Sequence, residues 1–251
     1  MNNFMKRFTK EICSDNVIFI TLKINNVMNF TKRSDEMYKS DKDMIHRLKK
    51  LSSTLVADGM DYENVMNYKI KPVNFQKTLV GQARTVSTYP GDNLYIHYGI
   101  YESEPGDILV VEGKGAVDSA YLGNLMAAAA QKLGIEGIII DGLIRDKDEI
   151  SKMDIQVYAQ GFTPKGPRKE GPGSFDKTIE CGRVVVNSHD YIIADEDGVV
   201  VIPYDIAEGV ITGAEEKKVY EAQRLKTINE SSEKEEIEPS WLRETINRKK
   251  Q

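Results

Sequence analysis

The segment from residue 108 to residue 141 constrains the fold more than any other part of the sequence. It runs from an apolar stretch, ILVVE (108–112), through a glycine-rich turn into a long helix-like stretch, and ends in a second apolar run, GIIID (137–141). Gly134 ends the helical part, and glycine is common just after the last turn of a helix. Strand, helix and strand over so short an interval form a βαβ unit, which predicts a parallel sheet and a right-handed crossover.

Further strands and helices are predicted around this unit. Residues 79–89 alternate as a strand does, and the PGDN turn after them offers Asp92 or Asn93 as the cap of a helix. Helices are also expected over residues 41–60, with a serine or threonine at 52–54 as a cap. More strands are expected at 155–161, 183–187, 191–195 and 198–203, a long Gly- and Pro-rich loop at 163–177, and helices after 205 with a break at Pro239.

These patterns predict an α/β protein with a central sheet, one βαβ unit and flanking helices. We divide the chain into three segments. Residues 1–45 form an extension of unknown role that contains a strand-like run at 17–24. Residues 46–212 form the α/β domain, and residues 213–251 form a charged helical segment.

Composition excludes several classes of protein. The net charge of −5 and the pI of about 5.4 argue against binding the backbone of a nucleic acid. Two distant cysteines, Cys13 and Cys181, indicate no disulfide framework and a reducing compartment. Three histidines, His46, His97 and His189, are too few for a His-rich zinc site and show no pattern of partners, so we expect them to be surface or packed residues.

The sequence also argues against a membrane protein. The first residues contain no apolar core of a signal peptide. The longest apolar stretch, residues 120–140, contains Gln131, Lys132 and Glu136, so we expect a buried helix and strand there rather than a membrane span. A cytoplasmic location is the resulting expectation.

The glycine-rich turn EGKGAVD (112–118) resembles part of a dinucleotide-binding motif. The third glycine of that motif is replaced by Asp118, whose carboxylate would repel a pyrophosphate at a helix N-terminus. We therefore interpret Asp118 as the N-cap of the helix. Gly123, Ala127 and Ala130 form a stripe of small residues on that helix, which favours close packing.

Arg145 and Asp146 follow the second strand of the βαβ unit. Ligands of open α/β sheets bind beyond the carboxyl ends of the strands, so this pair lies at the edge where ligands bind. Arginine matches a carboxylate with two parallel hydrogen bonds, and aspartate is a ligand that Mg²⁺ or Mn²⁺ prefers. Together they would suit a 2-oxo acid, although taken alone the pair is better explained as a structural ion pair.

Two other charged stretches have a simpler interpretation. The acids in ADEDG (194–198) could form a metal cluster, but an Asp-Gly turn between two strands explains them better. Lys165, Arg168 and Lys169 in the long loop could cover an anionic substrate, but charged residues in a loop are usually only solvated.

The stretch GNLMAAAAQKLGIEGIIIDGLIRDKDEI (123–150) resembles the signature of a known family. That family comprises 4-hydroxy-4-methyl-2-oxoglutarate aldolase and the regulator of ribonuclease E activity A. Its pattern is an acidic or similar residue, twenty residues, Arg-Asp, two residues and then Glu or Asp. Asn124, Arg145, Asp146 and Glu149 match it, and the likeness extends over roughly residues 50–225.

The resemblance implies a compact α/β fold that forms homotrimers or homohexamers. It also implies a class II aldolase that uses Mg²⁺ or Mn²⁺ and no Schiff-base lysine. Asp146 would ligate the metal, and Arg145 would hold the pyruvyl part of the substrate. The backbone N–H groups of Leu125 and Met126 would bind the substrate carboxylate, with Gly123 beside them in the substrate site.

Two catalytic positions of the family are less well matched. Asn124 stands where many members have an aspartate, and an amide cannot act as a base. Glu221, in KKVYEAQR, is the best match to a glutamate that a neighbouring subunit contributes in the family.

The implied activity is cleavage of 4-hydroxy-2-oxo acids, such as 4-hydroxy-4-methyl-2-oxoglutarate, to pyruvate. Loss of CO₂ from oxaloacetate gives the same enolate, so oxaloacetate decarboxylation is the implied second activity. The alternative is a protein that regulates an RNA-degrading enzyme without catalysis, and Arg145 and Asp146 alone do not separate the two.

Overall fold

A computed structural model describes residues 41–60 and 62–249. The strand predicted at 17–24, and nearly all of the predicted N-terminal extension, lie outside the described residues. Residues 41–46 belong to one unit of the chain, and the residues from Arg47 onward belong to a second compact unit. All helices and strands described below lie in this second unit.

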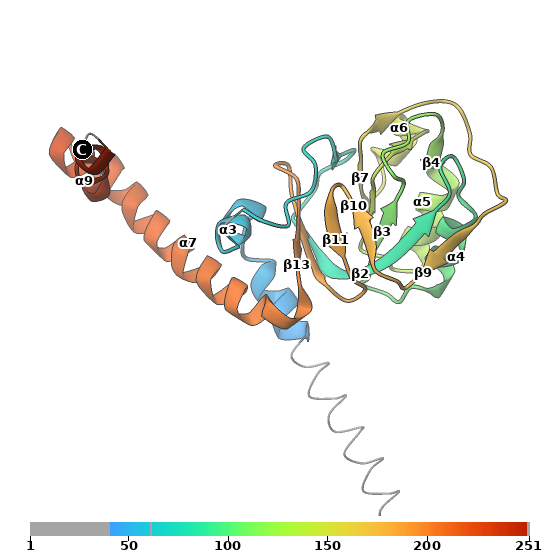
Figure 1. Ribbon diagram of the computed structural model, residues 1–251, viewed down its shortest axis with the longest axis horizontal. Helices are drawn as coiled ribbons and strands as arrows, with labels where there is room; N and C mark the ends of the chain where they lie inside the picture. Colours follow the sequence, from blue (N-terminus) through green and yellow to red (C-terminus); the bar gives the residue numbers. More distant parts are fainter. Residues whose placement is uncertain (1–40, 61, 250–251) are drawn as a thin grey trace, which may run out of the picture. The chain divides into compact units, whose positions relative to one another are not determined.

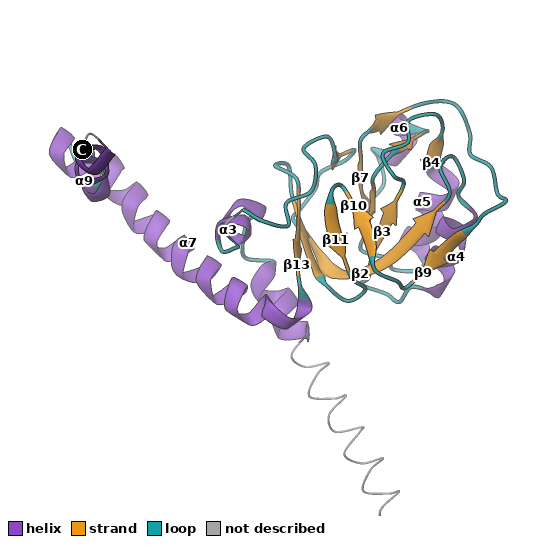
Figure 2. Cartoon of the chain, viewed as in Figure 1, coloured by secondary structure: helices purple, strands orange, loops and turns teal. Residues whose placement is uncertain are grey.

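The central sheet is built on parallel strands. β7 (Gln156–Ala159), β5 (Gly137–Ile140), β3 (Ile108–Glu112) and β2 (Leu79–Thr88) lie side by side in that order, and each neighbouring pair is parallel (Figures 1 and 2). The parallel β3–β5 pair confirms the predicted βαβ unit. Antiparallel strands flank these four in the described sheet, namely β12 (Tyr191–Ala194) and β13 (Val199–Ile202) beyond β2, β9 (Gly173–Phe175) on β2, and β1 (Lys71–Pro72) on β7.

The apolar runs of the parallel strands are buried on both faces of the sheet. In β3, Leu109 and Val111 belong to the core under helices α4 (Leu94–Glu102) and α5 (Asn124–Lys132). Ile108 and Val110 point the other way, into a second core that includes residues of the hairpin β10 (Ile179–Cys181) and β11 (Val184–Val186). Two covered faces explain why these strands are continuously apolar rather than alternating.

The predicted helix of the βαβ unit is shorter than expected. Residues 120–122 form a strand, β4 (Ala120–Leu122), that pairs with β6 (Leu143–Ile144), and β6 pairs with β8 (Gly161–Phe162). The helix, α5, begins only at Asn124, so the assignment of Asp118 as its N-cap is wrong. Asp118 is exposed in the loop before β4. The three residues of β4 are fully buried and pair as a strand, so no helix begins at Asp118.

The predicted helix ends are largely confirmed. Ser52 caps α3 (Ser53–Asp58), since its hydroxyl accepts a hydrogen bond from Leu55 N at 3.3 Å. Asn93 occupies the N-cap position of α4 without a side-chain cap, and the carboxylate of Asp92, one residue earlier, accepts from Leu94 N at 2.9 Å. Gly134 follows α5 with φ +82°, as expected for a glycine at that place.

The C-terminal part is helical, as predicted. The first turns of α7 (Ala207–Glu230) are buried through Ala207, Val210, Ile211 and Ala214. Other helices of this unit are η1 (Tyr204–Ile206), α6 (Lys147–Ile150), α8 (Lys234–Ile237) and α9 (Ser240–Lys249), and α9 begins directly after Pro239. Across the described ranges, no helix combines the length and the apolar character that crossing a bilayer requires.

The acids at 194–198 have a structural role. The carboxylate of Asp195, at the turn between β12 and β13, accepts hydrogen bonds from Ser53 N at 2.8 Å and Ser53 Oγ at 2.6 Å. It also accepts from Asp197 N at 3.0 Å, so it closes the hairpin turn and fixes the start of α3. The Asp-Gly turn is therefore confirmed.

We expect the change Asp195→Ala to lower the free energy of unfolding by about 2–4 kcal/mol, because it leaves buried donors of Ser53 without an acceptor. Urea unfolding followed by circular dichroism measures the change. The exposed neighbour Glu196 provides the control, and a loss as large in Glu196→Ala would contradict the assignment.

Candidate functional site

The pairing of two short strands brings the predicted site residues together. β4 and β6 run parallel, with Leu122 opposite Ile144, and Arg145 N donates to Leu122 O at 2.9 Å. The residues that follow the two strands therefore lie side by side. This pairing explains the interval of the sequence motif, because α5 and β5 fill the chain between the two strand ends.

Gly123 is needed for this close approach. A Cβ at this position would lie 2.6 Å from Asp146 Oδ2 and 2.9 Å from Arg145 Nε. Both distances are shorter than real Cβ contacts, so any side chain at Gly123 would displace both charged groups. The small residue here makes room for the site, while Ala127 and Ala130 of the same stripe pack in the core as predicted.

Asp146 is held in an uncommon backbone conformation. Its φ of +59° and ψ of +43° are left-handed, which Asp tolerates better than most residues. The residue precedes α6 but does not cap it with its side chain. Instead Oδ2 accepts a hydrogen bond from Asn124 N at 3.1 Å, so the carboxylate faces the N-terminus of α5.

Arg145 and Asp146 form a loose, partly exposed pair. Arg145 Nε lies 3.6 Å from Asp146 Oδ2, and the two side chains are 44% and 34% exposed. A structural ion pair would be closer and drier. Exposed pairs of this kind contribute at most about 1 kcal/mol to stability, so fold stability alone gives little reason to place them here.

Open space lies on both sides of Arg145. A cavity of about 240 Å³ extends over the start of α5, and a shallower one of about 310 Å³ lies beside Asp146 and Phe162. The first cavity is lined by Asn93, His97, Leu122, Gly123, Asn124, Leu125, Met126, Arg145, Pro167 and Lys169.

The first cavity is cationic. Among the described residues, no carboxylate side chain lines it, whereas Arg145 and Lys169 do. Within the described part of the chain, Lys169 has no acidic partner within 4.0 Å. Burial, and then the nearby charge of Lys169, lower the pKa of His97, so its imidazole is neutral at pH 7.

Sequence reasoning missed three residues of this cavity. His97 was expected to be a surface or packed residue without a role, and Lys169 only a solvated loop residue. Asn93 is buried, and its Oδ1 has no hydrogen-bond partner among the described residues, while Nδ2 donates to Tyr121 O at 3.1 Å. Their helix and loop are distant in sequence from the Arg-Asp motif, so no local pattern links them to it.

The long loop is more regular than predicted. Its end forms β9 on β2, and its middle is held by backbone hydrogen bonds from Asn93 N to Arg168 O at 3.0 Å and from Arg168 N to Gly91 O at 2.8 Å. Glu170 N also donates to Asp92 Oδ2 at 2.5 Å. These bonds hold Pro167 and Lys169 against the cavity.

The backbone N–H groups at the start of α5 differ in their hydrogen-bond acceptors. Asn124 N donates to Asp146, and Met126 N donates to Gly123 O at 3.1 Å. Among the described residues, Leu125 N has no acceptor, and the Leu125 side chain is exposed. Leu125 N is therefore the donor at this helix end that remains available to an anion.

Glu221 does not join this site within one chain. It lies on the exposed part of α7 and lines neither cavity. Its predicted role in a neighbouring subunit stays a prediction.

The donor set tests whether a divalent metal fits. In the described ranges, no three His, Cys, Asp or Glu side chains converge as a complete protein cage would require. Asp146 offers a single half-exposed carboxylate beside open space. Mg²⁺ commonly binds one or two carboxylates and completes its shell with water and substrate, so the residues present are compatible with such an ion.

This fold and its cationic cavity define an α/β protein with a site suited to a small anionic molecule. Comparison with protein families identifies the lineage, because residues 53–201 match the family described as RraA-like: Aldolase/RraA. The chain belongs to this family, as its Arg-Asp motif predicted.

Individual relatives agree with this assignment. A protein of Halalkalibacterium halodurans named "Putative 4-hydroxy-4-methyl-2-oxoglutarate aldolase" is 33% identical over 78% of this chain and 93% of its own length. The 4-hydroxy-4-methyl-2-oxoglutarate aldolase of Thermus thermophilus is 32% identical over 49% of this chain and 74% of its own. Streptomyces coelicolor RraAS2, described as an unusual member of the RNase ES inhibitor RraA protein family, shares the fold with a TM-score of 0.68 at 23% identity, over 74% of this chain and 98% of that one.

Proposed function

We propose that this protein is a divalent-metal-dependent pyruvate aldolase of class II that also decarboxylates oxaloacetate. Its substrates would be 4-hydroxy-2-oxo acids such as 4-hydroxy-4-methyl-2-oxoglutarate. The observation that carries the proposal is the partly exposed Arg145–Asp146 pair, held by the β4–β6 pairing at the N-terminus of α5 and open to a cationic cavity.

The residues of the chain would bind and orient the 2-oxo acid. Arg145 presents a planar fork that matches a carboxylate or an adjacent pair of oxygens. Leu125 N adds a donor at the positive end of α5. Lys169, on the loop across the same cavity, favours a substrate with a second carboxylate.

Asp146 would hold Mg²⁺ or Mn²⁺, with other positions left to water and substrate. Such an ion, when bound, polarises the 2-oxo group and stabilises negative charge on its oxygen. Gly123 keeps the space beside Asp146 clear, and Asn124 N fixes one oxygen of its carboxylate.

Aldol cleavage and oxaloacetate decarboxylation differ in whether they need a base at the position of Asn124. Aldol cleavage breaks the C3–C4 bond, leaves the electron pair on the pyruvyl half and releases the proton of the 4-hydroxyl, which a base must accept. Asn124 cannot be that base. Decarboxylation of oxaloacetate breaks the corresponding bond and releases CO₂ without a hydroxyl proton, so this reaction is the better assay for the site.

We expect Arg145→Lys to raise KM for oxaloacetate by roughly tenfold or more. The change keeps the charge but removes the two-pronged geometry, and hydrogen bonds to a charged group contribute about 1.5–3 kcal/mol. Pyruvate release coupled to NADH oxidation by lactate dehydrogenase measures this effect. An unchanged KM would show that Arg145 does not bind the substrate.

The change Lys169→Met is expected to raise KM for oxaloacetate about two- to fivefold at low ionic strength, because an exposed charge interaction contributes up to about 1 kcal/mol. Added salt should reduce the difference between variant and wild type. Lys165 of the same loop does not line this cavity, so Lys165→Met is the matched control. An equal effect in both variants would indicate only a general charge effect.

The site would be completed in a homotrimer or homohexamer, with Glu221 of a neighbouring subunit near Asp146, in the cytoplasm. Glu221 lies on an exposed helix and is available to another subunit. Sedimentation analysis together with the activity of Glu221→Gln tests this part. A fully active monomer would contradict it.

A second candidate function is inhibition of an RNA-degrading enzyme by binding to it, since the matching family is described as Aldolase/RraA and the structural neighbour RraAS2 is described as a member of an RNase ES inhibitor family. The assay that separates the two is oxaloacetate decarboxylation with Mg²⁺ or Mn²⁺ added. No pyruvate release with either metal, from a protein that is folded and oligomeric, would favour the regulator.

A further inference from the structure

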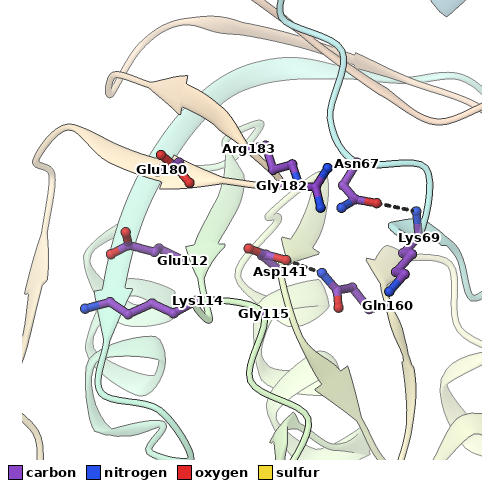
Figure 3. A pocket seen from close by; sticks show the side chains of 10 residues that line it. All are labelled: Asn67, Lys69, Glu112, Lys114, Gly115, Asp141, Gln160, Glu180, Gly182 and Arg183. Carbon is purple, nitrogen blue, oxygen red and sulfur yellow. Dashed lines mark hydrogen bonds between the residues drawn. The ribbon is translucent and has the colours of Figure 1, made fainter.

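A further cavity, larger than the two beside Arg145, lies at the carboxyl ends of the parallel strands. Its volume is about 490 Å³, and no residue of the Arg145 site lines it. Glu112 ends β3, Asp141 follows β5 and Gln160 follows β7, so three neighbouring strands deliver polar side chains to it (Figure 3). Open α/β sheets bind their ligands at this edge.

The hairpin β10–β11 covers one side of this cavity. Gly182 and Arg183 form its two-residue turn, and both have positive φ, +58° and +69°. Two left-handed residues give a tight turn that matches the twist of the strands. The turn directs Arg183 to the cavity, and Glu180 lies on the strand before it (Figure 3).

Charges of both signs line the cavity without pairing. In the described part of the chain, none of these side chains lies within 4.0 Å of an opposite charge. The cations Lys69, Lys114 and Arg183 are exposed, whereas the acids are distributed from the exposed Glu180 to the buried Asp141. The charged residues that line it are Lys69, Glu112, Lys114, Asp141, Glu180 and Arg183.

Asp141 is the deepest of these charges. It is 9% exposed and accepts a short hydrogen bond from Gln160 Nε2 (Figure 3). Burial raises the pKa of its carboxyl, and Glu180 raises it further by like-charge repulsion. A cation beside these two carboxylates would relieve the repulsion and stabilise the charged form of Asp141.

The lining excludes several ligand classes. The three carboxylates offset the three cations, so the cavity has no excess of positive charge for a polyphosphate, and no three potential metal ligands of the described residues converge on one ion. Among the residues that the structure describes, no aromatic side chain lines the cavity to stack on a sugar or a base. The class of ligand that remains is a small molecule with one positive and one negative charge.

We propose that this cavity binds a small zwitterion of the amino-acid type. Its ammonium group would lie against the buried Asp141, on the side of the hairpin that carries the exposed Glu180, and its carboxylate would face Arg183 and Lys114 at the rim. This site is separate from the proposed aldolase site, and the proposal holds whether or not the protein is an aldolase.

Calorimetric titration of the full chain at pH 8 tests the proposal. The probes are L-alanine and 5-aminopentanoate, compared with pentylamine and pentanoate, which carry one charge each. We expect at least one zwitterion to bind about tenfold more tightly than either singly charged probe. Loss of one charge-assisted hydrogen bond accounts for that factor.

Variants locate the binding. Asp141→Asn keeps the size and an acceptor for Gln160 and should weaken the zwitterion about tenfold or more. Arg183→Gln changes an exposed side chain at the hairpin turn, so it keeps the test valid if Asp141→Asn fails to fold. Lys132→Gln, on the far end of α5, is the control and should bind as wild type.

Three results would overturn the proposal. One is that neither zwitterion binds, which would mean that the charged side chains of the cavity are only solvated by water. Another is that pentanoate or pentylamine binds as tightly as the zwitterions. The last is that a folded Asp141→Asn or Arg183→Gln protein binds the zwitterion with unchanged affinity.

Discussion

Replacing Asp146 by asparagine is expected to lower kcat/KM for oxaloacetate decarboxylation roughly a thousandfold. Metal stabilisation of the transition-state charge contributes several kcal/mol, and each 1.36 kcal/mol is a factor of ten in rate. The change keeps the size of the side chain and an oxygen that can accept from Asn124 N. The measurement is pyruvate formation over a range of Mg²⁺ and Mn²⁺ concentrations.

The control for this variant is Asp148→Asn. Asp148 is exposed two residues further along and pairs with Lys152 at 2.7 Å, away from the cavity. It should retain wild-type activity and metal dependence. If Asp146→Asn keeps its activity while wild type is stopped by a chelator, the metal is held elsewhere.

The change Gly123→Ala is expected to lower kcat/KM for the same reaction about a hundredfold. The added methyl group would meet Asp146 Oδ2 and Arg145 Nε, and displacing reacting groups by about 1 Å can cost that factor. Both groups are ends of flexible side chains at a partly exposed site, so they can move aside with little loss of stability. Steady-state kinetics and thermal unfolding of the same preparation separate the two effects.

Gly213→Ala is the matched control, because nothing lies near a Cβ at that position of α7. It should keep full activity and slightly raise stability, since alanine favours a helix more than glycine. If Gly123→Ala loses activity only through unfolding, the steric role of Gly123 in the site is wrong.

The sequence predicted the elements whose signal is local. The continuous apolar runs of β3 and β5 indicated core strands of a parallel sheet, and Gly134 marked the end of α5. β4 was missed because Ala120 and Leu122 fit a helix as well as a strand. Only their pairing with β6, more than twenty residues later, decides between the two.

The candidate site shows the same division. The Arg-Asp motif could be predicted because Arg145 and Asp146 are neighbours that follow a strand. His97 could not, since an isolated histidine on a helix carries no pattern. The basic loop that holds Lys169 could be considered as a cover for an anionic substrate, but the sequence alone favoured a solvated loop. Their contribution depends on how α4 and the loop 163–172 fold over the start of α5.

The arrangement of Arg145 and Asp146 follows from main-chain pairing and from an empty space at Gly123, and neither charged side chain is part of the hydrophobic core. A descendant that exchanged both charges for neutral residues would therefore keep its architecture. Loss of catalytic activity would therefore not change the fold of such a protein. This independence gives a physical reason why one scaffold can be shared by proteins named as aldolases and by proteins described as RNase inhibitors, and why membership of the family has to be followed by an assay.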